Sequence, residues 1–109
     1  MIEVRTYIDA LGRRPFATRL DGLSGAAHAK VETAIARMEI GNLSNVRPVG
    51  SGVSEYRIDF GPGYRIYFGQ DGSTLIILLA GGTKRRQQRD IETAKALWQE
   101  YRQRKRQER

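Results

Sequence analysis

The sequence predicts an α+β fold in which helices cover one antiparallel sheet, in the order strand, two helices, three strands, helix (β-α-α-β-β-β-α). Three observations support this prediction. The N-terminus alternates apolar and polar residues, two longer segments repeat apolar residues every three or four positions, and three short runs separated by glycine turns lie between them. The 109 residues suit one domain, which we place at residues 1–101.

The N-terminal part is expected to form a strand followed by a helical hairpin. Alternation over residues 1–8 indicates the strand, and Gly12 ends it. Pro15 suits the first turn of a short helix, and Ser24 can cap a second one. Gly41-Asn42 ends the second helix. Its apolar residues recur at helical spacing: Ala27, Val31, Ala34, Ile35 and Met38.

Three strands are expected after a polar loop over residues 42–52. The predicted strands are Glu55–Phe60, Tyr64–Phe68 and Thr74–Ala80. Gly61-Pro62-Gly63 and Asp71-Gly72 are turn signals between them. The third strand is apolar on both faces, which is typical of a central strand covered on both sides.

A last helix is expected to begin between Lys84 and Asp90. One face of it is apolar: Ile91, Ala94, Leu97, Trp98 and Tyr101. Residues 102–109 hold five cations and one glutamate, and we expect this basic tail to be frayed at its end.

The chain is basic, with 19 Lys and Arg against 12 Asp and Glu and a formal net charge of +7. Such a surface attracts nucleic acid, ribosomes, anionic membranes or an acidic protein, and charge alone does not choose among them. No apolar run has the length of a membrane span, and the N-terminus does not resemble a signal peptide. The sequence has no cysteine and is therefore suited to a reducing cytoplasm. We expect the protein to be cytoplasmic and not to associate with a membrane.

The predicted hairpin over residues 55–68 has an apolar face and a charged face. A symmetric turn gives two cross-strand pairs on the charged face: Asp59 with Arg65, and Arg57 with Tyr67. Two interpretations stay open. Rigid strands can hold these arginines and the phenol for phosphate binding, or the face is simply solvated and carries an Asp59–Arg65 pair.

A second candidate feature, Gly81-Gly82-Thr83-Lys84, directly follows the apolar strand. Its glycines permit close approach of a ligand or another backbone, but their spacing does not match a P-loop. Cations at a helix start oppose the helix dipole, which favours an anion-binding role over a basic bend without function. The candidate phosphate-binding cations here are Lys84, Arg85, Arg86 and Arg89.

The residue types argue against most catalytic classes. His28 is the only histidine and lies in a predicted helix, so neither a histidine-based triad nor a His/Cys metal site is expected. Glu55 and Asp59 share a strand face, but the neighbouring arginines would compete with a metal ion for them. We therefore expect no metal and no cofactor.

RNA cleavage without a metal ion remains compatible with the sequence. The 2′-hydroxyl can attack its own 3′-phosphate if a base, an acid and cations are present. Arg65 and Lys84 can stabilise charge, and a lysine among other cations can act as the base. Tyr67 can stack on a nucleobase or donate a proton.

The segment Tyr56–Phe68, together with Gly81-Gly82-Thr83-Lys84 and Asp90–Lys95, resembles the RelE/HigB-like toxins of type II toxin–antitoxin systems, especially the addiction-module killer branch. The resemblance implies a compact RelE/ParE-like fold and ribosome-dependent mRNA cleavage. It also implies a cognate antitoxin, often a helix-turn-helix protein encoded by the adjacent gene. Matched by position, Arg65 is the active-site arginine, Lys84 or Arg85 is the basic residue after the sheet, and Arg57 is a further strand arginine.

The sequence departs from these relatives in its proton-transfer groups. It lacks the C-terminal Asp–Tyr–His cluster of some HigB-like members and the lysine pair that RelE places before its arginine strand. Three hypotheses therefore remain. The chain is an mRNA interferase, a ParE-like toxin that poisons DNA gyrase, or a non-catalytic module that binds nucleic acid or the ribosome.

Overall fold

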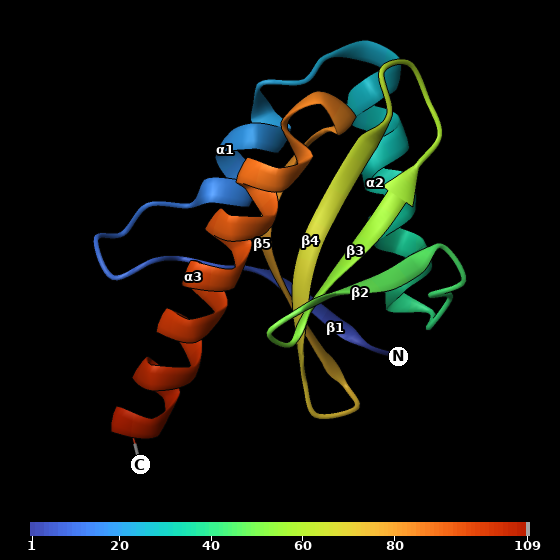
Figure 1. Cartoon of the computed structure of the whole chain (residues 1–109). Helices are drawn as coiled ribbons and strands as arrows, with labels where there is room; N and C mark the ends of the chain where they lie inside the picture. Colours follow the sequence, from blue (N-terminus) through green and yellow to red (C-terminus); the bar gives the residue numbers. More distant parts are fainter. Residues whose placement is uncertain (109) are drawn as a thin grey trace.

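One sheet organises the chain in the computed structural model, which describes residues 1–108 (Figure 1). Over these residues the sheet has five strands in the order β1-β5-β4-β3-β2. Their bounds are β1 Glu3–Thr6, β2 Val46–Gly50, β3 Val53–Ile58, β4 Tyr64–Asp71 and β5 Leu75–Thr83. Strand β1 is parallel to β5, and the other neighbouring strands are antiparallel. The predicted α+β class is confirmed.

Helices cover both faces of the sheet. The bounds are α1 Pro15–Asp21, α2 Gly25–Glu39, a 3-10 turn at Lys84–Arg86 and α3 Gln87–Gln107. Helices α1 and α2 pack on one face around Phe16, Met38 and Phe68, and α3 packs on the other around Tyr67 and Trp98. Strand β5 contributes to both cores, as its apolar pattern predicted, with Ile76 and Leu78 on the first face and Ile77 and Leu79 on the second.

The predicted polar loop over residues 42–52 was wrong in part, because it contains the edge strand β2. Pro48 and Gly50 conceal this strand in the sequence, since both residue types are rare inside sheets. An edge strand tolerates them, and a register irregularity lies between them. The sheet is also mixed rather than wholly antiparallel, because β1 enters beside β5 in the same direction.

The predicted register of the β3–β4 hairpin was also wrong. Arg57 lies opposite Arg65 and Glu55 opposite Tyr67, so neither the Asp59–Arg65 pair nor the Arg57–Tyr67 pair forms. The turn is longer than assumed because Gly61 and Gly63 both adopt positive φ, at 56° and 80°. The shift is an even number of residues, so the division into two faces is retained.

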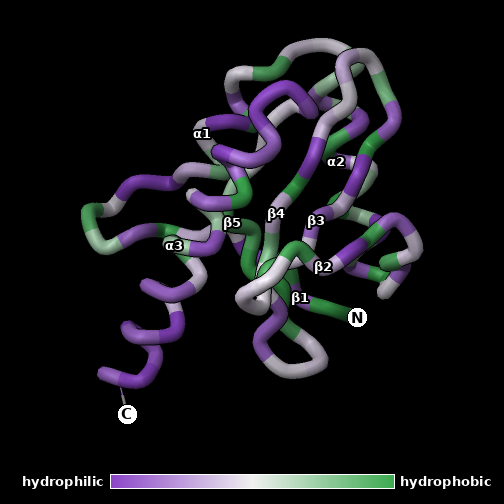
Figure 2. Tube along the Cα trace, viewed as in Figure 1, coloured by the Kyte–Doolittle hydropathy of each residue, from purple (hydrophilic) through white to green (hydrophobic). Residues whose placement is uncertain are grey.

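Helix α3 extends beyond the predicted boundary at residue 101 and includes most of the basic tail. Arg104 Nη1 donates to the Ile8 carbonyl at 2.8 Å, and the ammonium of Lys105 pairs with Asp71. These contacts tie the helix to the body of the molecule. Arg109 lies outside the described residues. Figure 2 shows that hydrophilic residues dominate the C-terminal half of α3, and none of the helices in residues 1–108 is long and apolar enough to cross a membrane.

Helix α3 packs so closely on β4 that a methyl group at Gly69 would overlap the Trp98 ring. We expect Gly69→Ala to lower the free energy of unfolding by about 1–3 kcal/mol, because an overpacked core must shift. Thermal unfolding followed by circular dichroism measures this as a Tm lower by about 4 °C or more. In a Trp98→Leu background the same substitution should cost little. Equal costs in both backgrounds would contradict the close packing of these two residues.

Candidate functional site

A group of buried polar side chains lies where β3, β4 and β5 meet the N-terminal turns of α3. It occupies the sheet face covered by α3, which the hairpin pattern had marked as the charged face. Four polar or charged residues of the chain's described part are buried, and three of them belong to this group: Glu55, Arg65 and Asp90. Burial of charge is costly unless the group is paired, so this concentration calls for an explanation.

Glu55 is the centre of the group, with a fully buried carboxylate. Its Oε1 accepts from Arg47 Nε at 2.9 Å, and its Oε2 accepts from Tyr67 OH at 3.0 Å and Gln87 Nε2 at 2.7 Å. Burial raises the pKa of Glu55, but these hydrogen bonds outweigh burial and hold the pKa below its usual value. Glu55 is therefore ionised, and both of its carboxylate oxygens already accept hydrogen bonds from the protein.

Tyr67 is fully buried, and its hydroxyl donates to Glu55. Burial, followed by the hydrogen bond to that carboxylate, raises the pKa of Tyr67 well above its usual value. In this conformation the ring is covered and cannot stack on a nucleobase. The residue instead joins β4 to the carboxylate on β3.

Arg65 is 7% exposed, and its buried Nε has no hydrogen-bond partner among residues 1–108. Oε2 of Glu55 lies 3.6 Å from that Nε, which is within ion-pair range but too far for a hydrogen bond. Arg57 lies directly opposite on β3, and like charges placed opposite each other destabilise a sheet. Arg65 thus combines an unused donor, which is shielded from solvent in this conformation, with a second cation on the neighbouring strand.

The turn after β5 brings Lys84 to the same place. The backbone N–H of Lys84 donates to the Gly63 carbonyl at 3.0 Å. Gly63 in turn lies against Arg65, since a Cβ there would be 3.2 Å from Nη1 of that arginine and 3.8 Å from the Lys84 Cβ. The structure thus places Arg57, Arg65 and Lys84 near one another.

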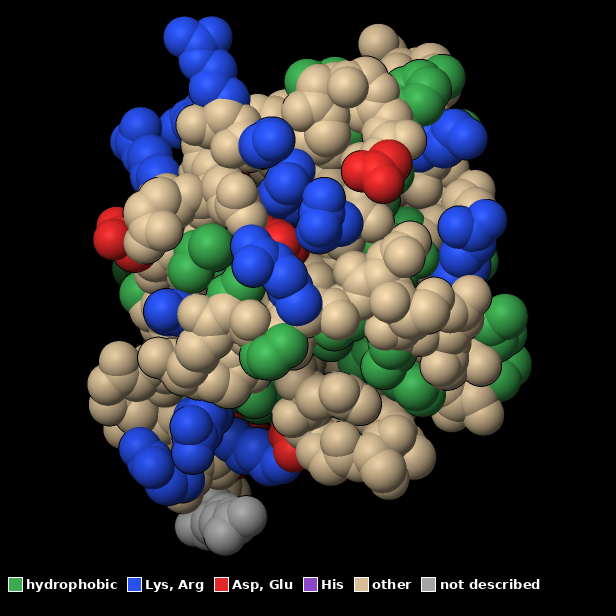
Figure 3. Space-filling view, turned by 45° about the vertical axis from the view of Figure 1, so that its right-hand side comes forward, with side chains coloured by type: hydrophobic (Ala, Val, Ile, Leu, Met, Phe, Trp, Pro, Cys, Tyr) green, Lys and Arg blue, Asp and Glu red, His purple; other side chains and the backbone are tan. Residues whose placement is uncertain are grey.

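The remaining predicted cations lie along the start of α3. Arg85 and Arg86 are exposed on the 3-10 turn, and Arg89 is exposed on the first helical turn. We call the exposed cations around Arg65 the basic rim: Arg57, Lys84, Arg85, Arg86 and Arg89. Lys and Arg side chains gather in the middle of one face of the molecule and again toward the C-terminal end of α3 (Figure 3).

Asp90 is a buried carboxylate that the sequence analysis did not single out. It is 8% exposed, and its Oδ2 has no hydrogen-bond partner within the described part of the chain. The carboxylate rests on the backbone of Gly82, where any side chain would overlap it. Burial raises the pKa of Asp90, and the opposing effect of Arg19, Arg86 and Arg89 is smaller.

Gly82 on β5 pairs with Arg65 on β4, so the Asp90 carboxylate of α3 lies over the strand next to the one that carries Arg65. Asp90 also lines a groove of about 800 Å³ between α1 and α3, together with Arg14, Arg19 and Leu97. A signal for Asp90 was available in the sequence, since it is an isolated acid after four cations at a helix start. The contact of Asp90 with Gly82 could not be predicted from the sequence.

Among residues 1–108 there is no group of three or more His, Cys, Asp or Glu side chains placed to hold a metal ion. Glu55, the carboxylate best placed by burial, is already bound by Arg47, Tyr67 and Gln87. His28 lies on α2 and pairs with Glu32, with 3.0 Å between Nδ1 and Oε1, away from the candidate site.

Comparison with known proteins identifies a similar chain in Haemophilus influenzae, a protein described only as uncharacterized. The two are 45% identical over 74 residues, which is 68% of this chain and 75% of the other. No protein-family model matches the chain.

The two buried carboxylates should affect stability in opposite directions. The folded pKa of Glu55 is lowered, so its ionised form stabilises the fold above the unfolded pKa, and this contribution is lost as pH falls through the folded pKa. We expect Glu55→Gln to destabilise the protein at pH 7 by about 1–3 kcal/mol, because donors around the carboxylate lose their ionised partner. Thermal unfolding at pH 7 and pH 3 measures the change.

For Asp90 the sign is reversed, because its folded pKa is raised and ionisation at pH 7 opposes folding. We expect Asp90→Asn to raise Tm by a few degrees at pH 7, and the gain to shrink as pH falls through the raised folded pKa and to be lost below the usual aspartate pKa of about 3.9. Glu55→Gln is the matched control of opposite sign. A fall in Tm for Asp90→Asn at pH 7 would show that the carboxylate is satisfied and stabilising.

Proposed function

We propose that this chain, which belongs to the same family as the Haemophilus influenzae protein, is the toxin of a type II toxin–antitoxin system and cleaves messenger RNA on the ribosome without a metal ion. One observation carries the proposal. The Arg65 guanidinium is buried on a rigid strand, has an unused Nε–H and faces Arg57. The resemblance of residues 56–68 and 81–84 to RelE/HigB-like toxins agrees with this placement.

An RNA phosphate fits the charge and the shape of this site. Guanidinium groups bind phosphate oxygens in a fixed fork, and a buried donor gains more from an anion than an exposed one. Lys84 stands beside Arg65 through the turn at Gly63. The basic rim extends the positive surface on both sides, so neighbouring phosphates of the same strand can be held as well.

The reaction would be an internal transfer. The ribose 2′-oxygen attacks the adjacent phosphorus while the bond to the 5′-oxygen of the next nucleotide breaks, leaving a 2′,3′-cyclic phosphate and a 5′-hydroxyl. Arg65 and Lys84 stabilise the extra negative charge on the phosphate oxygens in the transition state. A proton leaves the 2′-hydroxyl, and another is delivered to the departing 5′-oxygen.

Asp90 is the group that we assign to accept the 2′-hydroxyl proton. Its pKa is raised by burial, toward the range in which general bases operate. It stands on Gly82, next to Arg65, with Oδ2 unbonded. Lys84 carries an exposed ammonium suited to donate the proton to the leaving oxygen.

Glu55, Tyr67 and Gln87 act as positioning residues in this proposal. Their hydrogen bonds join β3, β4 and the start of α3 in one network. Because these side chains are bonded to one another, none of them is free to move into the place of the substrate. The ribosome contributes the alignment of the messenger RNA, which is worth several kcal/mol in reactions of this type.

The proposal predicts that Arg65→Lys with Lys84→Ala lowers mRNA cleavage by about 100-fold or more, as removal of a transition-state donor usually does. Lysine keeps the buried charge that Glu55 faces but loses the guanidinium fork. Transcript ends mapped after induction, with and without a translation inhibitor, measure cleavage and its dependence on the ribosome. Arg37→Gln, an exposed cation on α2, is the control, and thermal unfolding confirms that each variant folds.

Each outcome of this experiment has a clear meaning. Full growth arrest and unchanged cleavage by the double variant would overturn the site. Growth arrest with intact transcripts and a DNA-damage response would favour a gyrase toxin. Harmless expression with RNA binding retained would favour a non-catalytic module.

The proposed partner is an antitoxin, expected to be a helix-turn-helix protein encoded by the adjacent gene. The basic rim calls for an acidic antitoxin segment, because opposite charge speeds association and gives specificity. We expect the complex to protect Arg65 and Lys84 and to abolish RNA binding in an anisotropy titration. A complex that neutralises growth arrest yet binds RNA as tightly as the free chain would contradict this arrangement.

A further inference from the structure

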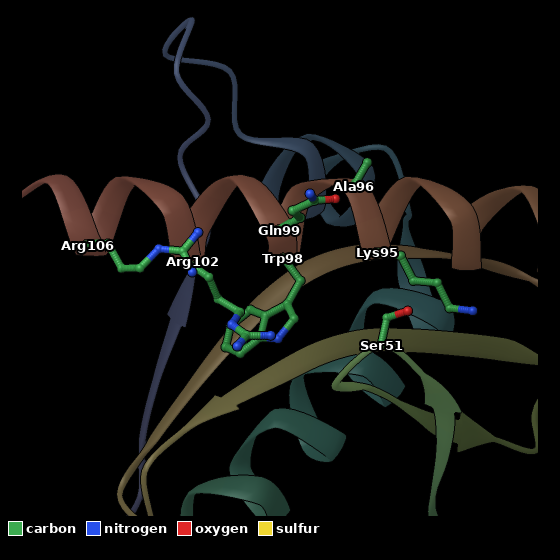
Figure 4. A pocket seen from close by; sticks show the side chains of 7 residues that line it. All are labelled: Ser51, Lys95, Ala96, Trp98, Gln99, Arg102 and Arg106. Atoms are coloured by element: carbon green, nitrogen blue, oxygen red, sulfur yellow. The ribbon is translucent and has the colours of Figure 1, made fainter.

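A second basic groove lies at the other end of α3. It has a volume of about 530 Å³ and runs between the C-terminal half of the helix and the turn that joins β2 to β3 (Figure 4). Its cations are Lys95, Arg102 and Arg106 on the helix, with Ser51 on the facing turn and Trp98 between them. None of the residues that line it is acidic.

The cations of α3 fall into two groups. Arg104 and Lys105 are bound to the body of the protein, through Ile8 and Asp71 respectively. By contrast, Lys95, Arg102 and Arg106 form no ion pair within residues 1–108. Cations near a helix C-terminus stabilise the helix dipole, but that effect is confined to the last turn and does not explain Lys95 or Arg102.

The three unpaired cations lie on one side of the helix. They are spaced by seven and four residues, which are intervals that return to the same face. Figure 4 shows Lys95, Trp98 and Arg102 extending from the side of α3 that faces the sheet. Lys95 and Arg106 are about 16 Å apart along the helix axis, enough for roughly five stacked nucleotides at about 3.4 Å each.

The opposite wall of the groove is a turn shaped to lie close to the helix. A Cβ at Gly50 would be 3.1 Å from Lys95 Nζ, and one at Gly52 would be 2.8 Å from Trp98 Nε1. Ser51 between them adopts a φ of 58°, which is uncommon for a residue with a side chain. The turn thereby presents the Ser51 hydroxyl at the groove and leaves the edge of the indole uncovered by a side chain.

The groove is rich in donors. Two guanidinium groups, an ammonium and a hydroxyl line it, and the Nε1 edge of the Trp98 indole faces Gly52. A neutral or cationic ligand would leave these charges unmatched, whereas a chain of phosphates matches their sign. Trp98 also offers an aromatic edge near a sugar or base.

From these contacts we propose that the groove binds the sugar–phosphate backbone of single-stranded RNA, as a site separate from the one around Arg65. About 24 Å of α3 separates Asp90 from Arg106, so one RNA strand or two parts of a folded RNA can contact both ends. Binding here does not require that the chain cleave RNA.

The test measures the affinity of the full chain for a fluorescein-labelled RNA 12-mer over a range of salt concentrations. The triple variant Lys95→Gln, Arg102→Gln, Arg106→Gln should reduce the slope of log affinity against log salt by about 2, since each phosphate contact to a single strand contributes about 0.7. The affinity at ~0.1 M salt should fall by about tenfold or more.

A matched control changes two exposed cations of α2 instead, Lys30→Glu and Arg37→Gln. It changes the net charge equally and should leave the slope nearly unchanged. Equal losses in both variants, or an unchanged slope in the groove variant, would overturn the proposal. So would a groove variant that binds RNA normally but loses binding to polyglutamate, which would indicate a surface for an acidic protein.

The two proposals fail separately. If the chain never cleaves RNA but the groove variant shows a smaller slope of log affinity against log salt, RNA binding in the groove is supported and the nuclease function is rejected. If cleavage depends on Arg65 but the groove variant keeps the slope of the unmodified chain, the nuclease function is supported and RNA binding in the groove is rejected. Thermal unfolding of the groove variant, whose three side chains are at least partly exposed, checks that it remains folded.

Discussion

The buried carboxylate of Glu55 is the interaction on which the rest of the candidate site depends. It receives donors from β2, β4 and α3, through Arg47, Tyr67 and Gln87. A buried carboxylate stabilises the fold only when all of its hydrogen-bond donors are in place, and loss of any one donor destabilises the fold. The carboxylate therefore fixes the edge of the sheet, its centre and the start of the long helix relative to one another.

This arrangement leaves a hydrogen-bond donor on Arg65 without a partner, although its charge lies within ion-pair range of Glu55. The donors that satisfy Glu55 come from other residues, so Arg65 keeps a buried Nε–H without a partner and faces Arg57. Asp90 is similarly incomplete, with an unbonded oxygen on Gly82. Unsatisfied groups are few in stable proteins, and their gathering at one end of a sheet is characteristic of functional sites, where stability is given up for binding.

Periodicity predicted the helices and the two-sided burial of β5, because both depend on local sequence. It did not predict β2, where Pro48 and Gly50 hide an edge strand, or the hairpin register, which depends on left-handed glycines at 61 and 63. The cations of the site were recognised from the strand face and the step after β5. The burial of Tyr67 and the contact of Asp90 with Gly82 were not, because both arise only when α3 packs on the sheet.

We propose that the Glu55 network holds Arg65 in position for an external phosphate. The most direct measurement is the Arg65 Nε–H resonance in a two-dimensional nitrogen–proton spectrum, during titration with RNA carrying 2′-O-methyl groups that block cleavage. We expect a large downfield shift of this proton on binding, because it gains a charge-assisted hydrogen bond. An Arg65 resonance that stays in place while those of the exposed arginines move would contradict it.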